Sequence, residues 1–138
     1  LAYHKRKISV FGGSQLRPNI HIADMVEAYV VLLNAPAEKI AGKIYNAGYE
    51  NQSVSDLAKM VREVVGKDVE LITTPTDDNR SYHISSNRIH EELGFKASHS
   101  IREAASDLVQ AFDQKLLPNS LTNEKYFNIK RMQNLRLT

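Results

Sequence analysis

The sequence predicts an α/β fold in which short, partly parallel strands alternate with about four helices. Three observations support this class. Short extended runs alternate with helical stretches, the helical stretches are ten or more residues long, and no internal repeat or low-complexity block interrupts them. Parallel strands need crossovers of that length. The chain has 138 residues, of which 42% are hydrophobic and 25% charged, so it is the size of one domain with one modest core.

Four short runs have the character of strands. Residues 8–11 alternate weakly and stop at a pair of glycines, and residues 19–22 form a second run after Pro18. Residues 43–47 and 69–73 are the other two, the first of them closed by a glycine. Sheets this small leave edges and faces that the chain covers only in part, so we expect something else to complete them.

The first expected helix begins near Asp24 and ends before Pro36. Asp24 and Glu27 have the D-x-x-E spacing of a capping box, so Asp24 is expected to cap this helix. The second is expected to begin after Ser53, as its cap, and to end at Gly66 in the left-handed conformation.

Two more helices are expected in the second half of the chain. A short one, marked by Ile89, is stopped by Gly94, with Phe95 placed to fold back onto it. The last one has a capping box of Ser100 and Glu103. Its apolar residues form a stripe that we expect to be buried as far as Pro118: Ile101, Ala104, Ala105, Leu108, Val109, Phe112 and Leu116.

Composition and charge exclude several classes of function. The net charge is only +2, tryptophan is absent, and the basic residues are spread out, so we expect no nucleic-acid partner. No run of about 18 apolar residues exists, and we expect no membrane span. The absence of cysteine excludes a disulfide framework, thiolate catalysis and the usual zinc ligand sets, and no metal site is expected. A cytoplasmic location is the expectation, since no leader precedes the first strand.

Residues 8–28 carry the most informative motif, I-S-V-F-G-G-S-Q-L-R-P-N-I-H-I-A-D-M-V-E-A. It closely resembles the substrate-loop signature of extended short-chain dehydrogenases that act on nucleotide sugars. Other stretches follow in the order of that family: I-Y-N-A-G at 44–48, S-V-S-D-L-A at 53–58, D-D-N-R-S-Y-H-I-S at 77–85 and E-L-G-F at 92–95. The resemblance covers residues 8 to about 112, and its strongest element is Q-x-R-P-x-I-H-I-x-D.

This resemblance implies the C-terminal part of the Rossmann-like extended short-chain dehydrogenase fold. Residues 1–118 would be the substrate-binding portion and residues 119–138 a C-terminal tail, with the N-terminal Rossmann half absent from this chain. Leu1 in place of an initiator methionine fits that expectation.

The resemblance also implies a set of substrate-binding residues. Arg17 and Arg80 match two arginines that reach the diphosphate of the nucleotide sugar, a task for which a guanidinium offers paired donors. Val10, Phe11 and Gln15 resemble the strand and loop of the family that contact the base.

Alternatives remain for several of these residues. An arginine in a loop is often solvated or paired with a carboxylate, and Asp77 or Asp78 could pair with Arg80 in this way. Tyr82, with its neighbour His83, lines the sugar pocket in one interpretation and is a packing residue in the other. We interpret His21, between two isoleucines of an expected strand, as a hydrogen-bonded structural histidine.

The residues that hydride chemistry needs are missing. No three glycines have the G-x-G-x-x-G or G-x-x-G-x-x-G spacing of a dinucleotide fingerprint. The pairs Tyr3/Lys7 and Tyr126/Lys130 have the Tyr-x-x-x-Lys spacing, but neither has the position of the family's catalytic pair, which lies upstream of the Q-x-R-P element. We therefore expect no catalytic and no cofactor-binding residue in this segment, and NAD or NADP is implied for the full-length enzyme only.

The predicted function is nucleotide-sugar binding, as the C-terminal portion of an NAD(P)-dependent nucleotide-sugar epimerase or dehydratase of deoxysugar or surface-polysaccharide precursor metabolism. The expected partners are a nucleoside diphosphate sugar and the missing Rossmann half, with a homodimer of the full-length protein also open. The segment alone is expected to be inactive. The alternative is a non-catalytic binding or assembly module that retains the fold without the chemistry.

Overall fold

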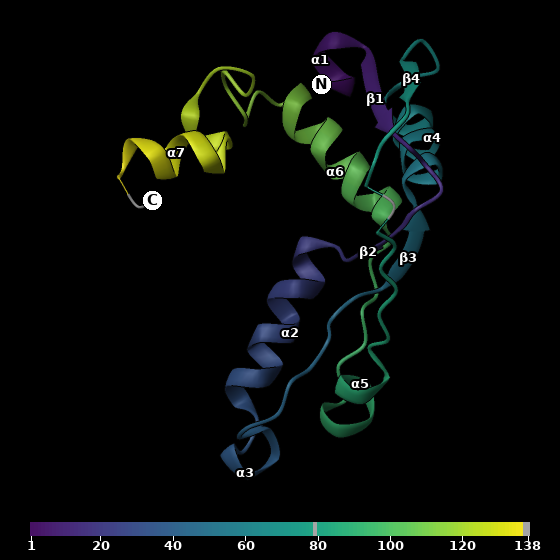
Figure 1. Cartoon of the computed structure of the whole chain (residues 1–138). Helices are drawn as coiled ribbons and strands as arrows, with labels where there is room; N and C mark the ends of the chain where they lie inside the picture. The colour runs from purple at the N-terminus through teal and green to yellow at the C-terminus, as the bar shows by residue number, and fades with distance from the viewer. Residues whose placement is uncertain (79, 137–138) are drawn as a thin grey trace.

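The computed structural model describes residues 1–78 and 80–136 (Figure 1). In chain order the elements are α1 (Ala2–Lys5), β1 (Lys7–Phe11), β2 (Leu16–Asn19), α2 (Ile22–Asn34), α3 (Ala37–Ile40), β3 (Glu50–Ser53), α4 (Val54–Val65), β4 (Glu70–Thr74), α5 (Asn87–Leu93), α6 (Ile101–Asp113), the 3₁₀ helix η1 (Glu124–Tyr126) and α7 (Asn128–Asn134). The four expected helices correspond to α2, α4, α5 and α6, and the short helices are additional. None of the helices in the described part of the chain is long and apolar enough to cross a membrane.

The strands form two small sheets. β1 and β4 pair in parallel, from Lys7 opposite Glu70 to Phe11 opposite Thr74, and α4 packs beside them and against α6. β2 and β3 pair antiparallel, and Pro18 is tolerated in β2 because the strand has a partner on one side only. The predicted α/β class with partly parallel strands is confirmed.

The helix ends follow the local sequence signals closely. The Ser53 hydroxyl accepts a hydrogen bond from the Asp56 amide at 3.0 Å, and Ser100 and Glu103 form a reciprocal capping box. Gly94 ends α5 with a left-handed φ of 75°. Gly66 ends α4, but its φ of 148° and ψ of 144° lie outside the left-handed helical region that we predicted.

Two predicted strands are placed wrongly. Residues 43–47 are not in a sheet: the Ile44 carbonyl accepts from the Arg88 side chain at 3.1 Å, and the Lys43 amide donates to the Ile40 carbonyl. The strand instead forms a few residues later, as β3, which pairs with β2. The run expected at 19–22 also fails, since β2 ends at Asn19 and a helix begins at Ile22.

The expected cap of α2 is also wrong. His21, not Asp24, is the N-cap residue, because its ring nitrogen Nδ1 accepts a hydrogen bond from the Ala23 amide at 3.1 Å. Asp24 therefore lies inside the first turn of α2. The helix ends at Asn34, as Pro36 requires.

One cluster of the hydrophobic core lies between α2, α5 and the segment that follows α5. Its buried members are Ala28, Ile89, Phe95 and Ala97, and Ile89 has no exposed surface. Phe95 folds back onto α5 as predicted. Tyr45 and Ala47 pack on this cluster from the extended segment before β3, which explains the apolar character of that segment without a strand.

The last long helix is less buried than its sequence predicts. α6 ends at Asp113, because the left-handed Lys115 and a hydrogen bond from the Leu116 amide to the Ala111 carbonyl close it in a Schellman-type turn. No residue of α6 is buried, and Leu108 of its apolar stripe is 55% exposed. The apolar stripe of α6 is therefore only partly packed against the rest of the chain, although its pattern predicts burial.

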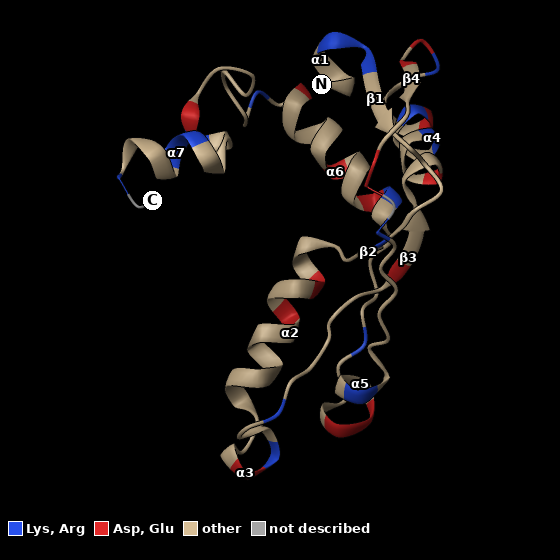
Figure 2. Ribbon diagram, in the orientation of Figure 1, with Lys and Arg blue, Asp and Glu red and all other residues tan. Residues whose placement is uncertain are grey.

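A second apolar surface is open on α2. Five of its residues are at least 48% exposed although they are large and apolar: Ile22, Val26, Tyr29, Val30 and Leu33. Figure 2 shows that this helix is almost free of charge beyond its first turns. η1 and α7 contact each other and project from the C-terminal end of α6 in Figure 1, on the side of the molecule where α2 also stands free.

Candidate functional site

The polar loop after β4 is attached to β2. The Leu16 amide donates to the Ser81 hydroxyl at 2.9 Å, and the Leu16 carbonyl accepts from the Tyr82 amide at 3.1 Å. These bonds bring residues more than 60 positions apart in the sequence to one edge of the small antiparallel sheet.

Arg17 extends from β2 toward this loop. Its Nη1 donates to the carbonyl oxygens of Arg80, at 2.6 Å, and of Leu16, at 2.9 Å. Its guanidinium lies 5.3 Å from the centre of the Tyr82 ring, within the range of a cation–π contact. The structure thus brings three of the predicted substrate-binding residues together: Arg17, Arg80 and Tyr82.

Arg80 is paired with a carboxylate. Its Nε and Nη2 donate to the two oxygens of Asp78 at 2.7 and 2.8 Å, a bidentate geometry, and Nη2 of Arg17 lies 3.8 Å from Asp78. The hydrogen bonds from Arg80 hold the pKa of Asp78 well below its usual value. The Arg80 side chain is nevertheless 73% exposed, so water screens this pair and a ligand can reach it.

The other three predicted residues form the turn after β1. Gln15 is buried, and its amide accepts from the Gly13 nitrogen at 2.6 Å and donates to the Phe11 carbonyl at 2.8 Å. Val10 is also buried, whereas Phe11 is 61% exposed. Of these three side chains only that of Phe11 is open to a ligand, and Gln15 holds the turn in shape.

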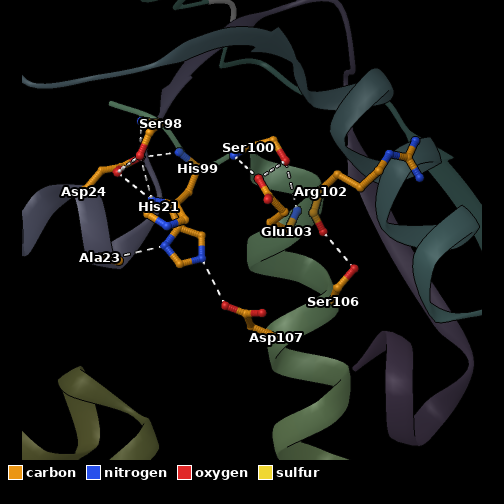
Figure 3. Close-up of polar contacts among 10 residues, drawn as sticks. All are labelled: His21, Ala23, Asp24, Ser98, His99, Ser100, Arg102, Glu103, Ser106 and Asp107. Carbon is orange, nitrogen blue, oxygen red and sulfur yellow. Dashed lines mark hydrogen bonds and ion pairs between the residues drawn. The ribbon is translucent and has the colours of Figure 1, made fainter. Parts of the chain in front are cut away.

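A second polar cluster joins α2 to the segment before α6 (Figure 3). The Asp24 carboxylate, 4% exposed, accepts hydrogen bonds from the backbone amides of Ser98 at 3.1 Å and His99 at 2.9 Å. It also accepts from Nδ1 of His99 at 2.7 Å. The charge that Asp24 buries is therefore well satisfied.

His21 completes this cluster. Its Nε2 lies 3.2 Å from the carboxylate of Asp107 on α6, and its ring stacks on that of His99 with the ring centres 4.9 Å apart. The predicted hydrogen-bonded, structural role of His21 agrees with these contacts. Ser98, His99 and Asp107 were not predicted, since no motif joins them to Asp24 across more than 70 residues.

The contacts of the cluster shift two pKa values in opposite directions. Burial alone would raise the pKa of Asp24, but the hydrogen bonds from His99 and Ser98 and the charge of His99 outweigh it and lower that pKa. The hydrogen bond to Asp24 raises the pKa of His99.

The turn after β1 differs from a dinucleotide-binding turn. The glycines after β1 lead into strand β2, so the turn is not followed by a helix whose amino end could receive a pyrophosphate. Tyr3, in the first Tyr-x-x-x-Lys pair, donates its hydroxyl proton to the Asp113 carboxylate, and this hydrogen bond raises the pKa of Tyr3. A tyrosine that acts as a proton-transfer group needs the opposite shift. In the second pair, Tyr126 contacts its neighbour Lys125.

A sequence model of the NAD dependent epimerase/dehydratase family matches residues 1–48, which include β1, β2 and α2. The UDP-glucose 4-epimerase of Corynebacterium glutamicum is 31% identical over 109 residues, which are 70% of this chain and 32% of that protein. A bifunctional UDP-glucose 4-epimerase and UDP-xylose 4-epimerase of Arabidopsis thaliana is 27% identical over 113 residues, 73% of this chain and 32% of that protein. The chain belongs to the NAD-dependent epimerase/dehydratase family.

Solved structures show the same fold at lower identity. The UDP-glucose 4-epimerase of Thermotoga maritima, in complex with UDP-glucose, superposes with a TM-score of 0.69 at 23% identity, over 80% of this chain and 36% of that one. The L-threonine dehydrogenase of Phytophthora infestans has a TM-score of 0.71 at 14% identity, over 83% and 39% of the two chains. This epimerase/dehydratase family chain therefore spans about a third of the length of the curated relatives that it matches.

The pH dependence of stability tests the Asp24–His99 pair. The lowered pKa of Asp24 contributes stability above about pH 4, which is lost on acidification, and the raised pKa of His99 contributes stability below about pH 6.5, which is lost as the pH rises through the folded-state pKa. We expect the free energy of unfolding, measured with urea, to fall between pH 6 and pH 9 in the wild type and to fall less in Asp24→Asn.

A control for this measurement is Glu91→Gln, which changes an exposed carboxylate on α5. This variant should keep the wild-type pH dependence. An equal slope between pH 6 and pH 9 in the wild type and Asp24→Asn would contradict the assignment.

Proposed function

We propose that this chain is the nucleotide-sugar-binding portion of an NAD(P)-dependent epimerase or dehydratase, acting on deoxysugar or surface-polysaccharide precursors. The observation that carries the proposal is the meeting of Arg17, Arg80 and Tyr82 where the loop after β4 is attached to β2. Residues 1–118 form the binding portion in this proposal, and residues 119–138 are its tail.

The chemistry of this edge suits a nucleoside diphosphate sugar. Two guanidinium groups lie beside the Asp78 carboxylate, and a diphosphate offers oxygens for several charge-assisted hydrogen bonds. The exposed rings of Phe11 and Tyr82 offer flat apolar surfaces for a base or a sugar. UDP-glucose, named with relatives of this chain, is the ligand of choice for a first test.

Asp78 has a defined part in this proposal. It pairs with Arg80 and offsets part of the charge of the two arginines while the ligand is absent, and a diphosphate that binds Arg80 in the same way must displace it. The exchange replaces one carboxylate by a group with more negative charge, so the arginines keep an anionic partner in both states.

The cofactor and the reaction belong to another part of the protein. Since the chain spans about a third of its relatives' length, we propose that an N-terminal Rossmann half supplies the NAD(P) site and the catalytic tyrosine and lysine. We propose the open apolar face of α2 as its contact surface, because large apolar side chains of this helix are exposed in this chain. Without that half the segment is inactive; the assembled protein is a cytoplasmic enzyme, able to form a homodimer.

Replacement of Arg17 tests the phosphate assignment. In the protein that contains both halves, Arg17→Ala removes a charge-assisted hydrogen bond and should weaken UDP-glucose binding about ten- to a hundredfold. Isothermal titration calorimetry measures the effect. Arg131→Ala, which removes an arginine from α7, is the matched control and should bind like the wild type. Unchanged affinity in Arg17→Ala would refute the assignment, and UDP-glucose binding without turnover in the wild type would favour the non-catalytic module.

Replacement of Asp78 tests whether this carboxylate competes with the ligand for the arginines. Asp78→Asn removes the negative charge that competes with the ligand, so UDP-glucose should bind more tightly than to the wild type, by about threefold or more. Asp77→Asn, its neighbour outside the bidentate pair, should have little effect. Weaker binding to Asp78→Asn would mean that Asp78 organises the loop and that Arg80 is not released to a ligand.

The contact with the Rossmann half is tested at Leu33, which is 84% exposed in this chain. Leu33→Lys should change the free energy of unfolding of the isolated chain by no more than about 0.5 kcal/mol. In the protein with both halves, the same change buries a charge and should cost about 2 kcal/mol or more. Chemical denaturation of both forms makes the comparison, and an equally small effect in the two would exclude this face of α2 as the contact.

A further inference from the structure

An imidazole caps the first turn of α2. Helix N-caps are usually serine, threonine, asparagine or aspartate, none of which changes its charge near neutral pH. Here the acceptor for the Ala23 amide is Nδ1 of His21, at 3.1 Å. Histidine is the side chain whose ordinary titration range lies between pH 5 and 8, so this cap is sensitive to protons.

The two contacts of His21 require one protonation state. Nδ1 must carry a lone pair to accept from Ala23, which places the proton of the neutral ring on Nε2. Nε2 is the nitrogen that lies 3.2 Å from the Asp107 carboxylate on α6. The neutral tautomer therefore satisfies both contacts, whereas a second proton on Nδ1 removes the acceptor of the cap.

The stacked ring of His99 adds to this sensitivity. Nδ1 of His99 donates to Asp24, and this bond survives protonation of His99 because the new proton goes to the other nitrogen. When both rings are protonated, two positive charges lie with their ring centres 4.9 Å apart. The His21 side chain is 6% exposed and that of His99 46%, so water screens this repulsion only in part.

The negative groups around His21 do not cancel the repulsion between the protonated rings of His21 and His99. Asp24 faces the cluster from α2, and Asp107 and Glu103 face it from α6, where Glu103 is held by the Ser100 cap. Asp24 already neutralises His99, and Asp107 is 66% exposed, which weakens its attraction for a buried charge. Glu27 and Lys96, which are of opposite charge, line the adjoining cavity of about 350 Å³ beside Asp24 and His99.

We propose that His21, with His99 stacked on it, is a proton-operated cap: on acidification it ceases to accept from the Ala23 amide and the first turn of α2 opens, while Nε2 keeps its contact with Asp107 on α6. The Asp24–His99 bond keeps α2 attached to the segment before α6, so the change is an opening of the helix start and not a loss of the fold. β2 ends two residues before His21, and the opening therefore reaches the end of the strand that carries Arg17. This proposal concerns the chain itself and does not depend on the proposed function.

The test is an NMR titration of the full chain from pH 8 to pH 4.5. In the wild type, the backbone carbon shifts of residues 22–25 and the amide shift of Ala23 should move toward non-helical values, with the same midpoint as the His21 ring signals. Movement of the Ala23 signals without the His21 ring, or no movement over this range, would overturn the proposal. This comparison needs no variant.

Two variants separate the contributions. His21→Asn keeps a good N-cap that does not titrate, so its helix start should be independent of pH. His90→Asn, an exposed histidine on α5, is the matched control and should keep the wild-type transition. A transition that persists in His21→Asn would show that another group controls α2.

His99→Asn keeps a donor for Asp24 but carries no charge. Removal of the repulsion should move the opening to lower pH by about half a unit or more. An unchanged midpoint would remove His99 from the proposed device.

Discussion

The buried carboxylate of Asp24 is the contact on which the arrangement of α2 depends. A charge that is 4% exposed is costly unless every lone pair has a partner, and the partners of Asp24 come from residues 98 and 99. The chain must therefore return to the start of α2 immediately before it enters α6. This return places the capping box of Ser100 beside α2 and brings Asp107 within reach of His21.

The same contact has consequences for the candidate site. β2 runs directly into α2, so the position of the helix start limits where the strand that carries Arg17 can end. The other end of the site is fixed by the attachment of residues 81 and 82 to Leu16. Arg17 and Arg80 lie close together because β2 is held at both ends: it leads into α2 at one end, and residues 81 and 82 bond to Leu16 at the other. The path of the backbone, and not only the contacts of the two side chains, places these arginines next to each other.

Local signals predicted most helix boundaries but few of the contacts between elements. Ser53, Gly94 and the Ser100–Glu103 box act on backbone groups within a few residues, so sequence spacing is enough to locate them. Residues 43–47 have the composition of a strand, but a strand forms only where a partner strand is available. The available partner, β2, pairs with β3 at residues 50–53 instead. Asp24 has the spacing of a cap, but donors about 75 residues away decide its role.

In the candidate site, too, local motifs predicted the residues but not the contacts between them. Arg17 and Arg80 were predicted because a family motif surrounds each of them, and the structure places them together. The bidentate pairing of Arg80 with Asp78, and not with Asp77, depends on the turn of the loop, which no pattern of residue types reveals. Val10 and Gln15 lie in the expected place, but their burial makes them supports of the turn.

The uncovered apolar surfaces are the physical argument for a larger assembly. A two-stranded sheet is marginally stable alone, and the described part of the chain has two of them, each with open edges. α2 buries one face against Ile89 and Phe95 and leaves large apolar residues of its other face in water. An amphipathic surface helix would have polar residues there. The sequence of α2 is thus that of a helix covered on both sides, and the proposed Rossmann half would supply the second cover and a wall of the ligand site together.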